Sequence, residues 1–131
     1  MPTDNRPGAD QPHLPSPAPI DAYGNGGFRF AGMSHRGSLL CLPDGIWPLA
    51  VSRFEDLTAG HLSLVFARAA ELDIFLIGCG IDMQPLPEML RGRFRELHMS
   101  VDAMQTGPAV RTYNILLAER RRVGAALIAV D

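Results

Sequence analysis

Two stretches of this sequence carry residue types that could do chemistry. The first is Gly-Cys-Gly at residues 78–80, which directly follows an apolar run. The second is T-G-P-A-V-R-T-Y-N at residues 106–114, which opens a helical pattern. A thiol becomes a nucleophile when a cation stabilises its thiolate, and arginine beside asparagine can bind an anion or a partner's backbone. Both stretches are therefore candidate sites.

The Gly-Cys-Gly stretch has two interpretations. A phosphate-binding loop needs backbone amides that point at the anion from the start of a helix. Here the third glycine of the dinucleotide fingerprint is missing, and Pro85 and Pro87 intervene before the next helical pattern. We therefore favour a tight turn at the end of a buried strand, a position where open α/β sheets form their crevices.

The thiols and imidazoles show no catalytic or metal-binding pattern. We expect Cys79 to be a small buried thiol and expect both cysteines, Cys41 and Cys79, to stay reduced. The histidines at positions 13, 35, 61 and 98 have no ligand spacing among themselves or with the cysteines. We expect no catalytic residue, no metal site and no cofactor.

Composition argues against some partners. All 12 basic residues are arginine, and 14 acidic residues bring the net charge to -2, so nothing favours nucleic acid as a partner. No apolar run approaches the roughly 20 residues that cross a bilayer, and the N-terminus lacks the order of a signal peptide. We expect a soluble, cytoplasmic protein without a transmembrane segment.

The first part of the sequence combines a tail with strand and turn signals. Residues 1–19 are rich in proline and poor in apolar side chains, which predicts a disordered tail. A single domain is predicted over residues 20–131. Pro43-Asp44-Gly45 lies between two apolar runs and predicts a hairpin, and Pro48 indicates that the second strand is at an edge or bulged.

The remainder alternates between helical and strand patterns. Helices are predicted over residues 57–72, 88–97 and 106–124. Strands are predicted over residues 73–78, 98–104 and 125–130, the first of them central and buried on both faces. Thr106 is expected to cap the last helix and Gly124 to end it. The fold class is a single three-layer α/β domain with a mixed central sheet, in which an N-terminal β-hairpin region precedes αβαβαβ.

The polar flank of the last helix leaves two alternatives open. Asn114 shares this flank with Arg111, beside an apolar stripe that includes Tyr113. Asparagine is a mediocre helix former whose side chain normally seeks a partner. It either ties the helix to a neighbouring loop or helps to bind an anion or a partner's backbone. The three arginines at 120–122 mostly complement the helix dipole.

Three stretches together resemble a known family. They are I-D-A-Y-G-N-G-G-F-R-F at 20–30, L-I-G-C-G at 76–80 and T-G-P-A-V-R-T-Y-N-I-L-L-A-E-R-R-R-V at 106–123. From residue 20 to 130 the sequence is similar to domain of unknown function family 498, whose relatives include an archaeal protein and mitochondrial complex I assembly factor 3. The resemblance implies a three-layer α/β fold, no established catalytic activity, and a role in assembling the respiratory NADH:quinone oxidoreductase complex beside a membrane. Arg120 departs from the family, which commonly has glycine there.

We therefore predict a non-catalytic binding or assembly protein rather than an enzyme. Its partners would be proteins, such as subunits of the respiratory complex or of another membrane complex, and the periphery of the inner membrane is an alternative location; homo-oligomerisation stays open. The predicted binding residues are Arg29, Gly78, Cys79, Gly80, Thr106, Arg111, Tyr113 and Asn114. The alternative function is an anion-binding protein or an enzyme at the strand-end crevice, where Arg29 and Arg111 would hold an anion and Cys79 or Asp82 would react.

Overall fold

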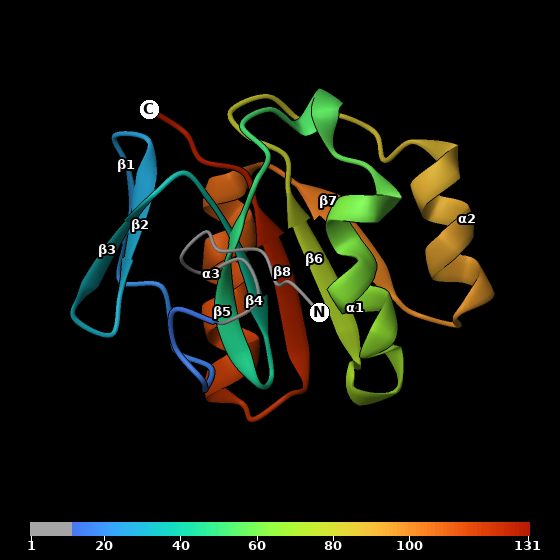
Figure 1. The fold of residues 1–131 in the computed structure, drawn as a ribbon, viewed down its shortest axis with the longest axis horizontal. Coiled ribbons are helices and arrows are strands. Elements are labelled where there is room, and N and C mark those ends of the chain that lie inside the picture. The colour runs from blue at the N-terminus through green and yellow to red at the C-terminus, as the bar shows by residue number, and fades with distance from the viewer. Residues whose placement is uncertain (1–11) are drawn as a thin grey trace, which may run out of the picture.

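A five-stranded mixed sheet lies at the centre of the computed structural model, which describes residues 12–131 (Figure 1). Its strands are β4 Ser38–Leu42, β5 Gly45–Leu49, β6 Ile74–Gly78, β7 Val101–Met104 and β8 Val123–Leu127. Their order in space is β5-β4-β8-β6-β7. β6 is parallel to β7 and β8, whereas β4 is antiparallel to β5 and β8. The predicted mixed sheet is confirmed, although β8 lies in the middle and β6, the expected central strand, lies beside it.

A smaller antiparallel sheet precedes the main one in the chain. It consists of β1 Ala22–Gly24, β2 Gly27–Phe30 and β3 Met33–Arg36, which form a meander at one side of the main sheet (Figure 1). Phe28 and Phe30 are buried along β2 while Arg29 between them is exposed, because successive side chains of a strand point to opposite faces. The sequence predicted strands here but not that they form a separate sheet.

The hairpin predicted at Pro43-Asp44-Gly45 joins β4 to β5. Leu42 pairs with Gly45 across the turn. Pro48 lies in β5, which is an outer strand of the main sheet. Proline is tolerated at an edge because an outer strand need not donate from every backbone amide. Both predictions are confirmed.

Helices cover the two faces of the main sheet (Figure 1). α3 Thr106–Ala118 packs on one face. α1 Ser63–Ala67 and α2 Glu88–Glu96 lie on the opposite face, where Phe75 of β6 stacks with Phe94 of α2 at a centroid distance of 5.7 Å. The predicted three layers are confirmed. None of the helices within residues 12–131 has the length and apolar character needed to span a membrane.

The segment predicted as one helix over residues 57–72 is broken into short pieces. They are the 3₁₀-helices η2 Ala59–Leu62 and η3 Ala69–Glu71, with α1 between them, and a further 3₁₀-helix, η1 Phe54–Asp56, precedes the segment. The Thr58 amide donates to His61 Nδ1 (3.0 Å) at the start of η2. The prediction of a continuous helix is wrong because local capping and the burial of individual leucines against the sheet override the helical spacing.

The last helix also ends earlier than predicted. Its final residue is Ala118, whereas Gly124 lies inside β8 and pairs with Phe75 of β6. The glycine that was expected to end the helix is therefore part of the sheet. Its position opposite a phenylalanine ring shows that packing between strands, not helix termination, sets the environment of Gly124.

A non-glycine residue terminates α3. The Arg120 amide donates to the Leu117 carbonyl (2.9 Å) and the Arg121 amide donates to the Leu116 carbonyl (3.0 Å). This pair of bonds is a Schellman motif, whose left-handed position glycine usually occupies. Arg120 takes that position with φ of 62°. Glycine would adopt this conformation without the strain that a side chain brings.

Part of the predicted tail packs on the domain. The His13 amide donates to the Ile46 carbonyl (2.7 Å) and the Ile46 amide donates to the Leu14 carbonyl (2.9 Å), which adds a bridge to the outer side of β5. His13 Nε2 also contacts His35 Nδ1 at 3.0 Å, and Ala18 is buried. The expectation of a disordered tail therefore does not hold for residues 12–19, while residues 1–11 lie outside the described residues.

Candidate functional site

The turn after β6 and the start of α3 form one buried hydrogen-bonded group. The Gly80 amide donates to Thr106 Oγ1 (3.0 Å), and the Thr106 amide donates to the Gly80 carbonyl (2.9 Å). Thr106 Oγ1 donates in turn to the Ile128 carbonyl (2.7 Å), just beyond β8. We call Gly78, Cys79, Gly80, Thr106 and Ile128 the strand-end node. Through these bonds Thr106 joins the ends of the parallel strands β6 and β8 to α3. The expected cap, in which its hydroxyl would accept from exposed amides of the helix, is not formed.

Two glycines of the strand-end node are required by geometry. A Cβ on Gly78 would lie 2.9 Å from Thr106 Cα and 3.2 Å from Ala109 Cβ, so α3 approaches β6 closely only over a glycine. Gly80 has φ of 103°, which side chains other than hydrogen disfavour. Close packing and a tight turn therefore account for both glycines without a bound phosphate.

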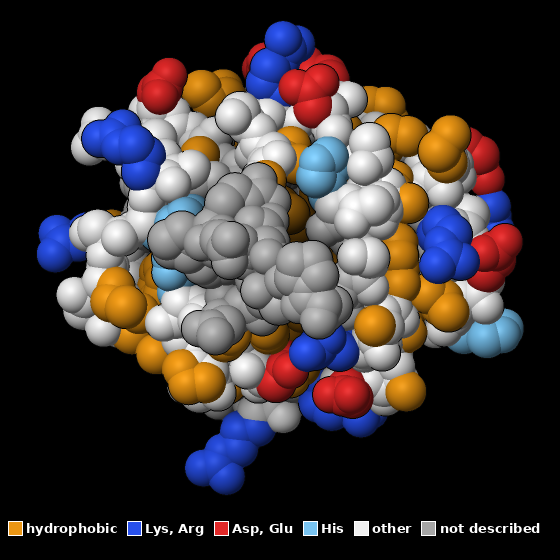
Figure 2. All heavy atoms as spheres, viewed as in Figure 1, with side chains coloured by type: hydrophobic (Ala, Val, Ile, Leu, Met, Phe, Trp, Pro, Cys, Tyr) orange, Lys and Arg blue, Asp and Glu red, His pale blue; other side chains and the backbone are white. Residues whose placement is uncertain are grey.

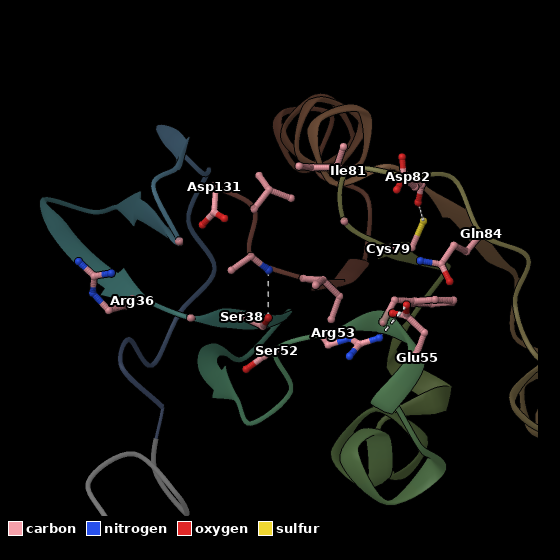
Figure 3. A pocket seen from close by; sticks show the side chains of 17 residues that line it. Arg36, Ser38, Ser52, Arg53, Glu55, Cys79, Ile81, Asp82, Gln84 and Asp131 are labelled. Carbon is pink, nitrogen blue, oxygen red and sulfur yellow. Dashed lines mark hydrogen bonds and ion pairs between the residues drawn. The ribbon is translucent and has the colours of Figure 1, made fainter.

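Both cysteines are buried free thiols. Cys79 is 2% exposed, and its Sγ donates to the Asp82 carbonyl at 3.3 Å (Figure 3). Cys41 lies in β4 and is fully buried. This burial raises the pKa of its thiol to about 12. Neither geometry presents a thiolate to solvent.

Tyr113 and Asn114 hold the chain segment that leads into β1. Asn114 Oδ1 accepts from the Ile20 amide (2.8 Å), and Asn114 Nδ2 donates to the Ile20 carbonyl (2.9 Å). The Tyr113 hydroxyl donates to the Ala18 carbonyl (3.2 Å). Burial raises the pKa of Tyr113, and the neighbouring Cys41 raises it further. The geometry is that of a tie to a neighbouring segment, one of the two alternatives left open for Asn114.

The two remaining predicted residues lie outside both groups. Arg29 is on β2, where its carbonyl accepts from the Asp21 amide (2.7 Å) and its side chain is exposed. Arg111 is on the exposed flank of α3. Of the eight predicted binding residues, four therefore lie in the strand-end node and two hold residues 18–20. Arg29 and Arg111 belong to neither group.

A pocket of about 420 Å³ opens beside the node, and we call it the strand-end pocket (Figure 3). Four stretches that are distant in the sequence supply most of its lining, within residues 36–38, 52–55, 79–84 and 128–131. Three residues named from the sequence, Cys79, Gly80 and Asp82, line it, whereas Arg29 and Arg111 do not. The crevice expected at the ends of parallel strands is therefore present, with different arginines beside it.

The walls of the strand-end pocket carry both charges and apolar groups. Arg53 and Glu55 form an ion pair (3.3 Å), and the pKa of Glu55 lies below its usual value, first because of a hydrogen bond to its own backbone and then because of Arg53. On another wall Ser38 Oγ accepts from the Ala129 amide (3.0 Å). Ile81, which is 64% exposed, lines the pocket from the turn.

Sequence reasoning missed most of these wall residues. No motif and no periodicity connects the turn before β4 with η1 or with the end of the chain, because tertiary packing alone brings them together. The signal that could be found was the position of Gly-Cys-Gly after a buried strand. That signal located one wall and gave no information on the others.

The pocket lining supplies charged, hydrogen-bonding and apolar groups. Its lining contains no histidine, and within residues 12–131 no group of three His, Cys, Asp or Glu side chains is placed to hold a metal ion. At the edges of the molecular face in Figure 2, acidic and basic side chains lie next to one another. Their numbers in the sequence, 14 acidic and 12 basic, are nearly balanced. The pocket therefore suits a partly polar, partly apolar ligand.

The sequence of this chain is similar to those of several known proteins. An uncharacterised protein from Rhodobacter capsulatus is 41% identical over 118 residues, which covers 90% of each chain. Mouse NADH dehydrogenase (ubiquinone) 1 alpha subcomplex assembly factor 3 is 29% identical over 118 residues, which covers 90% of this chain. The chain spans 64% of the length of that mouse protein.

A solved structure and a family model agree with these similarities. The crystal structure of a protein described as an outer membrane protein from Bartonella henselae matches with a TM-score of 0.88 and 50% identity, over 91% of this chain and 100% of the other. The model of a family described as protein of unknown function (DUF498/DUF598) matches residues 20–128. The chain is a member of the DUF498/DUF598 family of proteins of unknown function.

Proposed function

We propose that this chain is a non-catalytic binding protein that holds a segment of a partner protein in the strand-end pocket. We further propose that this binding assists the assembly of the respiratory NADH:quinone oxidoreductase complex or of another membrane complex. The observation that carries the proposal is the pocket of about 420 Å³ at the ends of β6 and β8, whose walls mix paired charges with an exposed isoleucine.

Several features of the pocket suit a polypeptide better than a reaction. The Cys79 thiol is bonded to a carbonyl and buried, so it lacks the exposure that reactive thiols have. Arg53 and Glu55 offset each other's charge. A mixture of apolar, aromatic and paired charged groups is common in surfaces that bind proteins. These features support a protein segment as the ligand.

Similarity to animal assembly factors supports the second part of the proposal. The mouse relative is named an assembly factor of the NADH dehydrogenase alpha subcomplex. The chain spans 64% of the length of that relative. A role in assembly, and the partners that this role needs, are therefore proposals for this chain. We place this protein in the cytoplasm at the periphery of the inner membrane, where it would meet an incomplete complex.

A complementation experiment tests the proposal. In native cells that lack the gene, NADH:quinone oxidoreductase would be quantified on native gels after rescue by wild type or by variants. Arg53→Glu with Ile81→Asp changes the pocket wall and rim. Arg91→Glu with Met89→Asp makes a matching charge reversal and a matching apolar-to-acidic change on the exposed face of α2, outside the pocket lining.

The expected result is full rescue by wild type and by the α2 variant, and loss of rescue by the pocket variant at equal protein abundance. Equal rescue by both double variants would remove the pocket from the function. Normal amounts of the complex in cells without the gene would remove the respiratory complex as the target.

A small polar molecule is the second candidate ligand. The volume of about 420 Å³ falls within the roughly 300–1,000 Å³ of small-molecule sites. Arg36 and Arg53 line the pocket and would hold the anion, the role predicted for Arg29 and Arg111. Thermal stabilisation of the purified protein by a metabolite, lost in Arg53→Glu but kept in Arg91→Glu, would favour this candidate over a protein segment.

A further inference from the structure

The two outer strands of the main sheet differ in how their edges are covered. β5 contains Pro48, and its outer side is bridged by the chain's own residues His13 and Leu14. β7 pairs with β6 on one side, and within residues 12–131 no strand or bridge pairs with its other side. Proteins normally block sheet edges because unpaired backbone groups there recruit further strands. Of the two outer edges of the main sheet, that of β7 is thus the open one.

The hydrogen bonds of β7 identify the backbone groups that face outward. The carbonyls of Ser100 and Met104 accept from amides on the β6 side, at 2.9 and 2.8 Å. Bonding residues alternate along a parallel ladder, so Asp102 turns its N–H and C=O toward β6 as well. Val101 and Ala103 therefore turn their N–H and C=O groups away from the sheet. Both residues are half-buried, unlike the buried residues of β6 beside them.

The side chains along this edge carry a charge. Asp102 is exposed on the opposite face of β7 from Val101 and Ala103, which pack against the core under α2. At the end of the strand Gln105 Nε2 donates to the Ile81 carbonyl (2.6 Å). An added strand would therefore meet two backbone pairs and one carboxylate.

We propose that the outer edge of β7 binds an extended segment of another protein as an added strand, with a basic residue opposite Asp102. The argument for the basic residue is charge complementarity, since opposite charges directly across two strands stabilise them. A second copy of this chain fits less well. The antiparallel register that joins the outward groups of both copies pairs Val101 with Ala103 and is centred on Asp102, which would place two carboxylates in the closest type of cross-strand pair.

This surface is independent of the strand-end pocket. β7 residues do not line the pocket, so a failure of the complementation experiment leaves the edge proposal in place, and the reverse also holds. Where both surfaces act, a partner could be held by a strand at the edge and by a separate segment in the pocket.

Amide exchange measured by NMR on the full chain tests the proposal. The probes are two short capped peptides of alternating valine and threonine, one with arginine at its centre and one with glutamate. In the free protein we expect the Val101 and Ala103 amides to exchange faster than those of Asp102 and Met104. Saturation to nine-tenths with the arginine peptide should slow exchange at Val101 and Ala103 about tenfold, because binding leaves them open a tenth of the time.

Two variants make the outcome specific. Asp102→Arg should reverse the preference, so that the glutamate peptide protects and the arginine peptide does not. Ala103→Pro removes an outward amide that makes no bond in the sheet, so it should keep the melting temperature and lose peptide binding.

Three results would overturn the proposal. They are Val101 and Ala103 amides already protected in dilute free protein, equal protection by the two peptides, and a preference unchanged in Asp102→Arg. Protection that grows with protein concentration and needs no peptide would assign the edge to a second copy instead.

Discussion

Thr106 connects more of the fold than any other polar side chain at the strand ends. Its hydroxyl serves the Gly80 amide and the Ile128 carbonyl, and all three groups are buried. Thr106→Val keeps the shape of the side chain and leaves both partners unpaired. We expect the free energy of unfolding to fall by about 1–3 kcal/mol, measured by urea denaturation.

Thr106→Ser is the matched control for this substitution. Serine keeps the hydroxyl and should retain most of the stability that valine loses. If Thr106→Val were as stable as wild type, the strand-end node would have no energetic importance, and its position beside the pocket would be incidental.

Arg120 offers a gain in stability at a single position. A residue other than glycine with φ of 62° is strained, by about 1 kcal/mol or more. Arg120→Gly should therefore raise the free energy of unfolding by up to about 1 kcal/mol, because glycine relieves the strain at this Schellman position. The measurement is a thermal or chemical melt.

Arg121→Gly serves as the comparison for Arg120→Gly. Arg121 does not have a positive φ, so glycine there adds only chain entropy to the unfolded state and should lower stability. Equal effects of glycine at the two positions would contradict the assignment of strain to Arg120.

At the scale of elements, Asn114 attaches the segment before β1 to α3. Its amide group pairs with both backbone groups of Ile20, much as a neighbouring strand would. Asn114→Ala should lower the free energy of unfolding by about 1–3 kcal/mol. Hydrogen exchange should accelerate most at residues 18–24, while β6 and β8 stay protected. Arg111→Ala on the exposed flank should change stability by less than about 0.5 kcal/mol, and a similar loss in both variants would refute the attachment.

A histidine pair connects the N-terminal segment to β3 and makes this contact sensitive to pH. His35 Nε2 lies 3.0 Å from the Ser38 carbonyl, and His35 Nδ1 lies 3.0 Å from His13 Nε2. A carbonyl only accepts, so Nε2 carries the hydrogen and Nδ1 must accept from His13. Protonation of His35 would turn Nδ1 into a donor, and the contact would then require the His13 tautomer in which Nε2 accepts. Neutral His35 makes the contact without that change of tautomer.

The direction of the pH effect follows from the shift of His35. Burial lowers the pKa of His35 below the ordinary value of 6.5, the Ser38 hydrogen bond opposes this, and His13 adds to the lowering. Below about pH 6.5 the unfolded state binds more protons than the folded state, so stability falls as the pH falls through that range. The melting temperature should drop less in His35→Gln than in wild type between about pH 7.5 and about pH 5.5. Equal drops would show that this pair does not contribute.

The sequence predicted elements where periodicity and turn chemistry agreed. The hairpin at Pro43-Asp44-Gly45 and the buried run that became β6 are examples. It failed over residues 57–72, where apolar residues repeat at helical spacing and are buried in one core cluster, but the backbone alternates between 3₁₀ and α turns. It also failed at residues 12–19, because their contacts with β5 and α3 lie far away in the chain and leave no local pattern.

At the scale of the whole molecule, the candidate site shows the same limit. The position of Gly-Cys-Gly after a buried strand led to the strand-end crevice, and the pocket beside Cys79 and Gly80 lies there. The opposing wall, with Arg53 and Glu55, could not be predicted because only the tertiary fold brings η1 and the residues after β8 to the same pocket. Arg29 and Arg111 were predicted as anion-binding residues because of their charge. The fold exposes both of them outside the pocket lining.

The central claim is that the strand-end pocket holds a partner protein, and site-specific photocrosslinking in native cells tests it most directly. A photoreactive residue at Ile81, which is 64% exposed at the pocket, would be compared with one at Met89, which is 78% exposed on α2. We predict that the probe at Ile81 forms a discrete product with a subunit of the NADH:quinone oxidoreductase or another membrane complex, and that the probe at Met89 does not. The same products from both positions, or none from Ile81 in folded protein at native abundance, would contradict the account.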